Sequence, residues 1–176
     1  MIAPIATVEE FYAHALAIER EAAERYAEFT AYFSDRDEEA LAGLCANLAA
    51  MERAHFDDLA AACASLVLPV IGAHRYQWLE AGAPESAARE LLYRVATPRQ
   101  LLEIALAAEW RAREFFVNIA LTAPSREVRE LASVMAAEEG EHVRWVRNAL
   151  EYRDTSEPDW NELLAHGTGP GVVTSD

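Results

Sequence analysis

Two seven-residue stretches decide the fold of this chain: AAMERAH at positions 49–55 and AAEEGEH at positions 136–142. Both follow the pattern Ala-Ala-x-Glu-x-x-His, so a glutamate precedes a histidine by three positions in each stretch. Residues three apart lie on one face of an α-helix. Each stretch therefore predicts a carboxylate and an imidazole on the same side of one helix, Glu52 with His55 and Glu139 with His142.

Each stretch also has a matching glutamate upstream. Glu19 begins an E-x-x-A-x-x-x-Y segment 33 residues before Glu52, and Glu109 begins an E-x-x-A-x-x-x-F segment 30 residues before Glu139. Four carboxylates and two imidazoles are the ligand set with which four-helix bundles hold two iron or manganese ions. Such ligands suit iron and manganese, although ligand type alone leaves zinc open. Four carboxylates would also balance two divalent cations, which lowers the cost of burying the charges.

Helix caps and breakers predict two helical hairpins. Thr7-x-x-Glu10 is a capping box, and Thr97-Pro98-x-Gln100 joins a capping threonine to a proline at the first helical position. Turns are predicted at 34–37 and at 123–125. The helices are then expected at about 8–33, 37–66, 98–122 and 126–152.

These elements predict an all-α fold, a four-helix bundle that forms one domain over residues 1–153. The connection between the hairpins, about 67–97, is expected to be partly ordered, with a short helix within 86–95, because structureless loops of that length are uncommon. A short C-terminal tail, 154–176, follows the bundle and is expected to form at most a turn of helix at 158–165.

The spacing of the glutamates tests whether they meet. In an antiparallel hairpin, residues equidistant from the turn lie at the same height. The midpoint of Glu19 and Glu52 is 35.5, inside the first predicted turn, and that of Glu109 and Glu139 is 124, inside the second. The caps and breakers that predict these turns are independent of the glutamates. Both hairpins are therefore predicted to bring their glutamates level.

The composition argues against nucleic-acid and membrane partners. The 176 residues include 15 arginines, no lysine and 30 acidic residues, for a formal net charge of −15. A chain this acidic is repelled by phosphate backbones. No run of about 18 apolar residues predicts a membrane span, and the N-terminal residues do not follow a secretory signal pattern. We expect a cytoplasmic protein.

The same residues also have simpler interpretations. A single Glu-x-x-His is usually a solvated helix face, and a buried histidine is often only a satisfied core residue. Four glutamates at one depth are harder to explain without a cation, because charged residues are seldom buried unpaired. His14, His74 and His166 match no ligand spacing, so the predicted ligands are only Glu19, Glu52, His55, Glu109, Glu139 and His142.

The two halves differ in the residues that would support the ligands. Tyr26 has a hydroxyl that can hydrogen-bond a ligand carboxylate, whereas its counterpart Phe116 has none. Glu138 can orient the opposite histidine, His55, whereas its counterpart Met51 cannot accept a hydrogen bond in that way. We therefore predict two inequivalent metal positions, with the one at His142 less firmly supported.

Together these motifs resemble the ferritin-like superfamily, and within it rubrerythrins and related erythrins that lack a rubredoxin domain. The resemblance covers about residues 8–152. It implies that Glu52 and Glu139 bridge two irons, that Glu19 and Glu109 are terminal ligands, and that each histidine binds one iron.

The chain departs from the patterns of these families at two positions. Rubrerythrins carry a further glutamate three residues after the third-helix ligand, where this chain has Ala112, so their redox-linked ligand switch is not expected here. Bacterioferritins place a haem-binding methionine directly after the first bridging glutamate, where this chain has Arg53. No Cys-x-x-Cys pair is present either, so the chain has no rubredoxin-type electron-transfer module.

The resemblance implies a di-iron oxidoreductase, of peroxidase or ferroxidase type, that reacts with hydrogen peroxide or dioxygen. Electrons would come from an external donor, and the protein would form a homodimer or another small homo-oligomer. Three alternatives remain at this stage: a non-catalytic iron-binding or storage protein, a manganese catalase-like bundle, and a metal-free helical interaction module.

Overall fold

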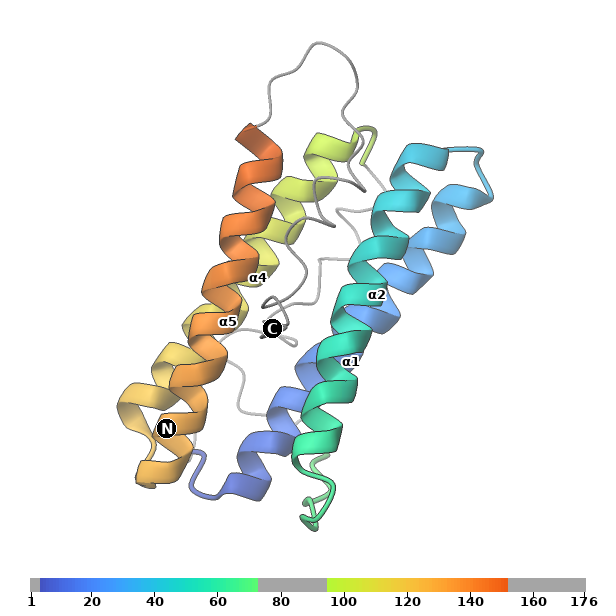
Figure 1. Cartoon of the computed structure of the whole chain (residues 1–176). Helices are drawn as coiled ribbons and strands as arrows, with labels where there is room; N and C mark the ends of the chain where they lie inside the picture. The colour runs from blue at the N-terminus through green and yellow to red at the C-terminus, as the bar shows by residue number, and fades with distance from the viewer. Residues whose placement is uncertain (1–3, 73–94, 152–176) are drawn as a thin grey trace, which may run out of the picture.

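The computed structural model describes residues 4–72 and 95–151, and these form four helices (Figure 1). The helices are α1 (Val8–Ser34), α2 (Glu39–Ala62), α4 (Pro98–Thr122) and α5 (Arg126–Glu151). No strand occurs among the described residues. Helix α1 packs along α2, and α4 packs along α5, so that two hairpins lie side by side. The predicted all-α bundle of two hairpins is confirmed.

The predicted caps start two of the helices. The Thr7 hydroxyl accepts the Glu10 N–H at 3.1 Å, and the Glu10 carboxylate accepts the Thr7 N–H at 3.4 Å. This reciprocal capping box satisfies backbone donors that the first turn of α1 would otherwise leave unpaired. At α4, the Thr97 hydroxyl accepts the Gln100 N–H at 3.3 Å, and Pro98 is the first helical residue. Both predicted starts, at 8 and at 98, are confirmed.

Helix α2 is shorter than predicted at both ends. Asp37 has a φ of 57°, a left-handed conformation that ends the turn, so α2 begins at Glu39 and not at 37. At the other end the chain leaves the helix after Ala62, and the Leu66 N–H donates to the Cys63 carbonyl at 2.9 Å in a turn. The predicted end at 66 is wrong because this local turn replaces the helical hydrogen bonds ahead of Pro69.

Several predictions fall outside the described residues. Most of the 67–97 connection, including most of the short helix expected within 86–95, lies in residues 73–94, and the C-terminal tail lies in residues 152–176. Among the four described helices, none combines the length and apolarity needed to cross a membrane.

Two apolar clusters flank the middle of the bundle. The first cluster draws on both hairpins around the α1–α2 turn, and its large buried members include Tyr26, Phe29, Phe33, Leu41, Leu44, Leu48, Leu101 and Val146. The second cluster surrounds the α4–α5 turn, and its members include Phe11, Ile18, Phe115, Phe116, Ile119 and Val128. Burying each such side chain contributes about 1.5–3 kcal/mol. The clusters therefore hold the hairpins together on either side of the polar residues between them.

Candidate metal centre

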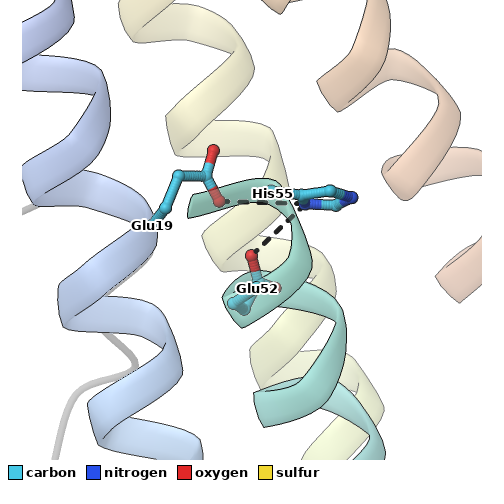
Figure 2. Close-up of side chains that lie close together, drawn as sticks. All are labelled: Glu19, Glu52 and His55. Atoms are coloured by element: carbon cyan, nitrogen blue, oxygen red, sulfur yellow. Dashed lines mark ion pairs between the residues drawn. The ribbon is translucent and has the colours of Figure 1, made fainter. Parts of the chain in front are cut away.

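All four predicted glutamates lie in the middle of the bundle, between the two apolar clusters. Their side chains are almost completely buried, with exposures of 0–1%: Glu19, Glu52, Glu109 and Glu139. Each hairpin forms one triad with ligand atoms within 4.8 Å of one another. The first triad, shown in Figure 2, is Glu19, Glu52 and His55, and the second triad is Glu109, Glu139 and His142.

In the first triad the histidine stands between two carboxylates from neighbouring helices. His55 Nδ1 is 3.8 Å from Glu19 Oε2 on α1 and 3.9 Å from Glu52 Oε2 on its own helix (Figure 2). The 33-residue spacing places Glu19 opposite α2 at the right height for this contact. The level arrangement predicted from the midpoint is therefore confirmed for the first hairpin.

The second triad repeats this arrangement more tightly. His142 Nδ1 is 3.3 Å from Glu109 Oε2 on α4 and 3.3 Å from Glu139 Oε2 on α5. The His142 side chain is only 5% exposed, whereas that of His55 is 28% exposed. The hairpin with the shorter, 30-residue spacing therefore holds the more compact and more enclosed triad.

The two triads meet at their histidines. The imidazole rings of His55 and His142 are stacked, with centroids 4.4 Å apart and planes 8° from parallel. Because α2 and α5 belong to different hairpins, this contact joins the two triads across the bundle. The six predicted residues therefore form one centre with two halves.

The donor atoms of this centre fit metal ions. Among the described residues, both carboxylate oxygens of Glu19, Glu52 and Glu139 are buried without a hydrogen-bond partner, as are Nδ1 of both histidines and one oxygen of Glu109. Burying an ionised carboxylate without compensation costs several kcal/mol. Cations resolve this cost, since four carboxylates neutralise two divalent ions. The two triads could therefore hold two metal ions, as ligand sets of oxygen and nitrogen do.

Without a cation, protons must balance the same charge. Burial, followed by the neighbouring Glu139 and Glu52 carboxylates, raises the pKa of Glu19 well above its usual value. Burial likewise raises the pKa of Glu139 to about 8. Burial alone would lower the pKa of His142, but the Glu109 and Glu139 carboxylates 3.3 Å from its Nδ1 outweigh burial and raise that pKa to about 11. Metal binding at this centre must therefore displace protons.

The two triads differ in geometry: the second has the shorter contacts and the more buried histidine. This difference in exposure arises from the packing between the hairpins, which leaves His55 at the edge of a cavity. No motif within a single helix predicts that packing. That the metal position at His142 is less firmly supported, because of Phe116 and Met51, stays a prediction.

The two supporting residues have different positions. Tyr26 is 1% exposed and belongs to the first core cluster, two turns after Glu19 on α1. Glu138 is exposed, and no hydrogen bond joins it to His55 in the described part of the chain. Hydrogen bonding of a ligand by Tyr26, and orientation of His55 by Glu138, stay predictions.

His14 is buried but lies outside both triads. Its Nδ1 is 2.7 Å from the Glu10 carbonyl oxygen, and its ring stacks on that of Phe115, with the ring centroids 6.3 Å apart. The backbone contact and the stacking explain this buried histidine without a metal. That His14 is no primary ligand stays a prediction.

The sequence motifs missed two features of the site. One is Trp145, whose ring centroid lies 5.1 Å from that of His142, with the two ring planes at 31° to each other. It stands one turn after His142 on α5, a spacing that could have predicted the contact. The other is a cavity of about 950 Å³ between α1, α2 and α5, which borders Glu19, His55, Glu139 and His142. A cavity between hairpins depends on how they pack, and no local pattern predicts it.

Fold and site together define an all-α protein with a paired carboxylate–histidine centre. No family model and no curated protein matches the chain. One solved structure does: the crystal structure of an uncharacterized conserved protein from Magnetospirillum magnetotacticum MS-1. It is 30% identical with a TM-score of 0.63, and the match covers 85% of this chain and 98% of that one. The chain belongs to the family of that conserved protein.

Proposed function

We propose that this protein is a ferritin-like di-iron carboxylate protein of the erythrin type, and that it reacts with hydrogen peroxide or dioxygen. The observation that carries the proposal is the buried pair of triads, whose unpartnered carboxylates need about four positive charges. Two divalent cations supply that charge, and oxygen and nitrogen donors suit iron and manganese. The charge match and the ligand chemistry support a resident metal pair.

The residues that would hold the metals follow from the triads. Glu19 with His55, and Glu109 with His142, would each serve one ion, while Glu52 and Glu139 would be shared, as the resemblance to erythrins implies. Two ferrous ions, when bound, supply one electron each, which is the number needed to cleave a peroxide O–O bond. An external donor would restore those electrons, since the chain has no Cys-x-x-Cys module.

The chain itself would control protons and water at the centre. Reduction of hydrogen peroxide to two waters consumes two protons, which would have to enter with the oxidant through the cavity, because carboxylates that bind metal have given up their own protons. Glu19 and Glu139 border the cavity, so a small oxidant arriving there meets both groups.

The proposal is tested by metal analysis and by spectroscopy. Freshly purified protein should contain about two metal ions per chain, and iron-loaded protein should change its optical spectrum on addition of peroxide over repeated cycles with a reductant. Glu52→Ala should lose most of the metal and the spectral change. Glu24→Ala, an exposed glutamate on α1, is the matched control and should retain both.

Three outcomes would contradict the proposal. Fewer than about one metal ion per chain, with no stabilisation on adding iron, would leave the metal-free interaction module. Release of iron after each oxidation would favour storage or transfer over an oxidoreductase. Manganese content together with oxygen evolution from peroxide would instead identify a catalase-like bundle.

A further inference from the structure

The cavity beside the two triads is much larger than the proposed oxidant requires. Its volume is about 950 Å³, and it borders Glu19, His55, Glu139 and His142. A water-sized molecule occupies about 30 Å³, whereas sites for organic ligands commonly measure about 300–1,000 Å³. Hydrogen peroxide or dioxygen would leave most of this space unused. The volume is that of a site for an organic molecule.

The walls of the cavity are mainly apolar. Side chains from three helices contribute, among them Phe11, Met51, Leu59, Leu131, Met135 and Trp145. Such walls stabilise a ligand by removing its apolar surface from water, and they provide few hydrogen bonds to a polar one. The body of the ligand is therefore expected to be a hydrocarbon chain or ring.

The charges at the cavity restrict the head group of such a ligand. Asp58 and Glu138 border the cavity, are exposed, and have no ion-pair partner among the described residues. A third acid, Glu141, is paired with Arg144. Of the described residues that line the cavity, none is an arginine. Beside these exposed acids a carboxylate head group would be repelled, whereas a neutral or cationic head group would be tolerated or attracted.

We propose that this cavity binds an apolar organic molecule with a neutral or cationic head group, such as an alkyl alcohol or alkyl amine. The bound molecule would lie against the faces of Glu19 and Glu139. A role for this molecule as a second reactant at the metal centre would rest on the proposed function. Its binding depends only on the cavity.

Binding is measured with three ligands of equal chain length: decylamine, decanol and decanoate. Each is titrated into the full chain, both chelator-treated and loaded with zinc, so that no redox turnover occurs. Trp145 in the cavity wall reports binding by its fluorescence, and Trp145→Phe identifies its signal among the four tryptophans. Decanol and decylamine should bind saturably with about one site per chain, and decylamine about tenfold more tightly than decanoate.

Two pairs of variants locate the site. Ala54→Phe places a ring into the cavity and should weaken decanol binding at least about tenfold, whereas Ala61→Phe, at an exposed alanine on the same helix outside the cavity, should not. Asp58→Asn with Glu138→Gln should reduce the preference for amine over acid. Asp57→Asn with Glu114→Gln changes the net charge equally away from the cavity and should preserve that preference.

The outcomes separate this proposal from the proposed function. Absence of saturable decanol binding, or equal weakening by both phenylalanine variants, would overturn the cavity assignment even if the protein holds iron and reacts with peroxide. Conversely, decanol binding that Ala54→Phe abolishes supports the cavity site even if metal analysis finds no iron.

Discussion

At the scale of single residues, the centre consists of buried groups that need a proton or a cation to offset the free-energy cost of burying their charge. Glu139 is fully buried, and its pKa is raised to about 8. His142, beside it, has a pKa raised to about 11. Both groups bind protons more tightly in the folded protein than in the unfolded chain. The metal-free fold is therefore most favoured where these protons are retained.

This gives a prediction for the pH dependence of stability. A group whose pKa is higher in the folded protein than in the unfolded chain stabilises the fold at pH values below its unfolded pKa. That stabilisation is lost as the pH rises towards and through its folded pKa. For Glu139 the loss falls between about 4.5 and 8, and for His142 between about 6.5 and 11. Chelator-treated protein should therefore melt at a lower temperature at pH 8 than at pH 5.5, while added metal should stabilise it more at pH 8.

The control for this effect is Glu139→Gln, which removes the titrating carboxyl while nearly preserving its size. The high net negative charge of the chain also lowers stability as pH rises, so the wild-type slope should exceed that of the variant. Equal slopes, or a melting temperature that rises with pH in metal-free protein, would show that Glu139 does not hold the proton.

A second prediction at this scale concerns the order of metal loading. The second triad is more compact and more buried than the first, so its donors are better positioned before metal arrives. The first equivalent of a divalent metal should therefore occupy the position at His142. In a titration followed by anomalous scattering, His142→Ala should weaken the first binding step and His55→Ala mainly the second. Equal occupancy at limiting metal would contradict this order.

At the scale of helices, α5 contains a glycine in the middle of the site. Gly140 lies between Glu139 and Glu141 in regular helix, where glycine is less favourable than alanine by about 0.5–1 kcal/mol. A Cβ there would meet Arg113 Nε at 3.6 Å, an ordinary contact. Nothing in the surrounding packing therefore requires the glycine.

Gly140→Ala is accordingly expected to stabilise the fold by about 0.5–1 kcal/mol through the helix propensity of α5, with unchanged metal content. Urea unfolding of chelator-treated protein measures the change. Ala137→Gly, at an exposed position one turn earlier, is the reverse control and should destabilise by a similar amount. Loss of stability in Gly140→Ala would indicate that the glycine is needed for a backbone adjustment at the ligands.

At the scale of the whole molecule, the two hairpins are joined by the apolar clusters and by the centre between them. Each cluster contains residues of both hairpins, and the His55–His142 contact crosses the same interface. Any cation that binds only the folded centre must stabilise the whole bundle by mass action, by about 2.7 kcal/mol at a free concentration 100 times its Kd.

Metal loading should therefore raise the melting temperature by roughly 5–10 °C for a domain of this size. Differential scanning calorimetry with iron(II) under anaerobic conditions, or with zinc, measures the shift, and a chelator should reverse it. The double substitution His55→Ala with His142→Ala should remove most of the increase. A shift that persists in that variant would place the metal elsewhere.

Much of this structure was predictable because it depends on local patterns. Thr7 and Thr97 start their helices through contacts three residues away, and the Glu-x-x-His spacing places a carboxylate and an imidazole on one face. The equal distances of Glu19 and Glu52 from their turn also made their common height predictable. The end of α2 was less predictable, because several similar local hydrogen-bonding patterns compete after Ala62.

The sequence by itself determined the four helices, the two hairpins and the identity of the six residues at the centre, because caps, breakers and helical periodicity act within a few residues. Only the tertiary structure decided which half of the centre is tighter, that His55 stacks on His142, and that a large apolar cavity borders them. These features depend on the relative placement of α2 and α5, which belong to different hairpins. That placement is set by the packing of the two apolar clusters, and side-chain packing between distant segments has no signature in either segment alone.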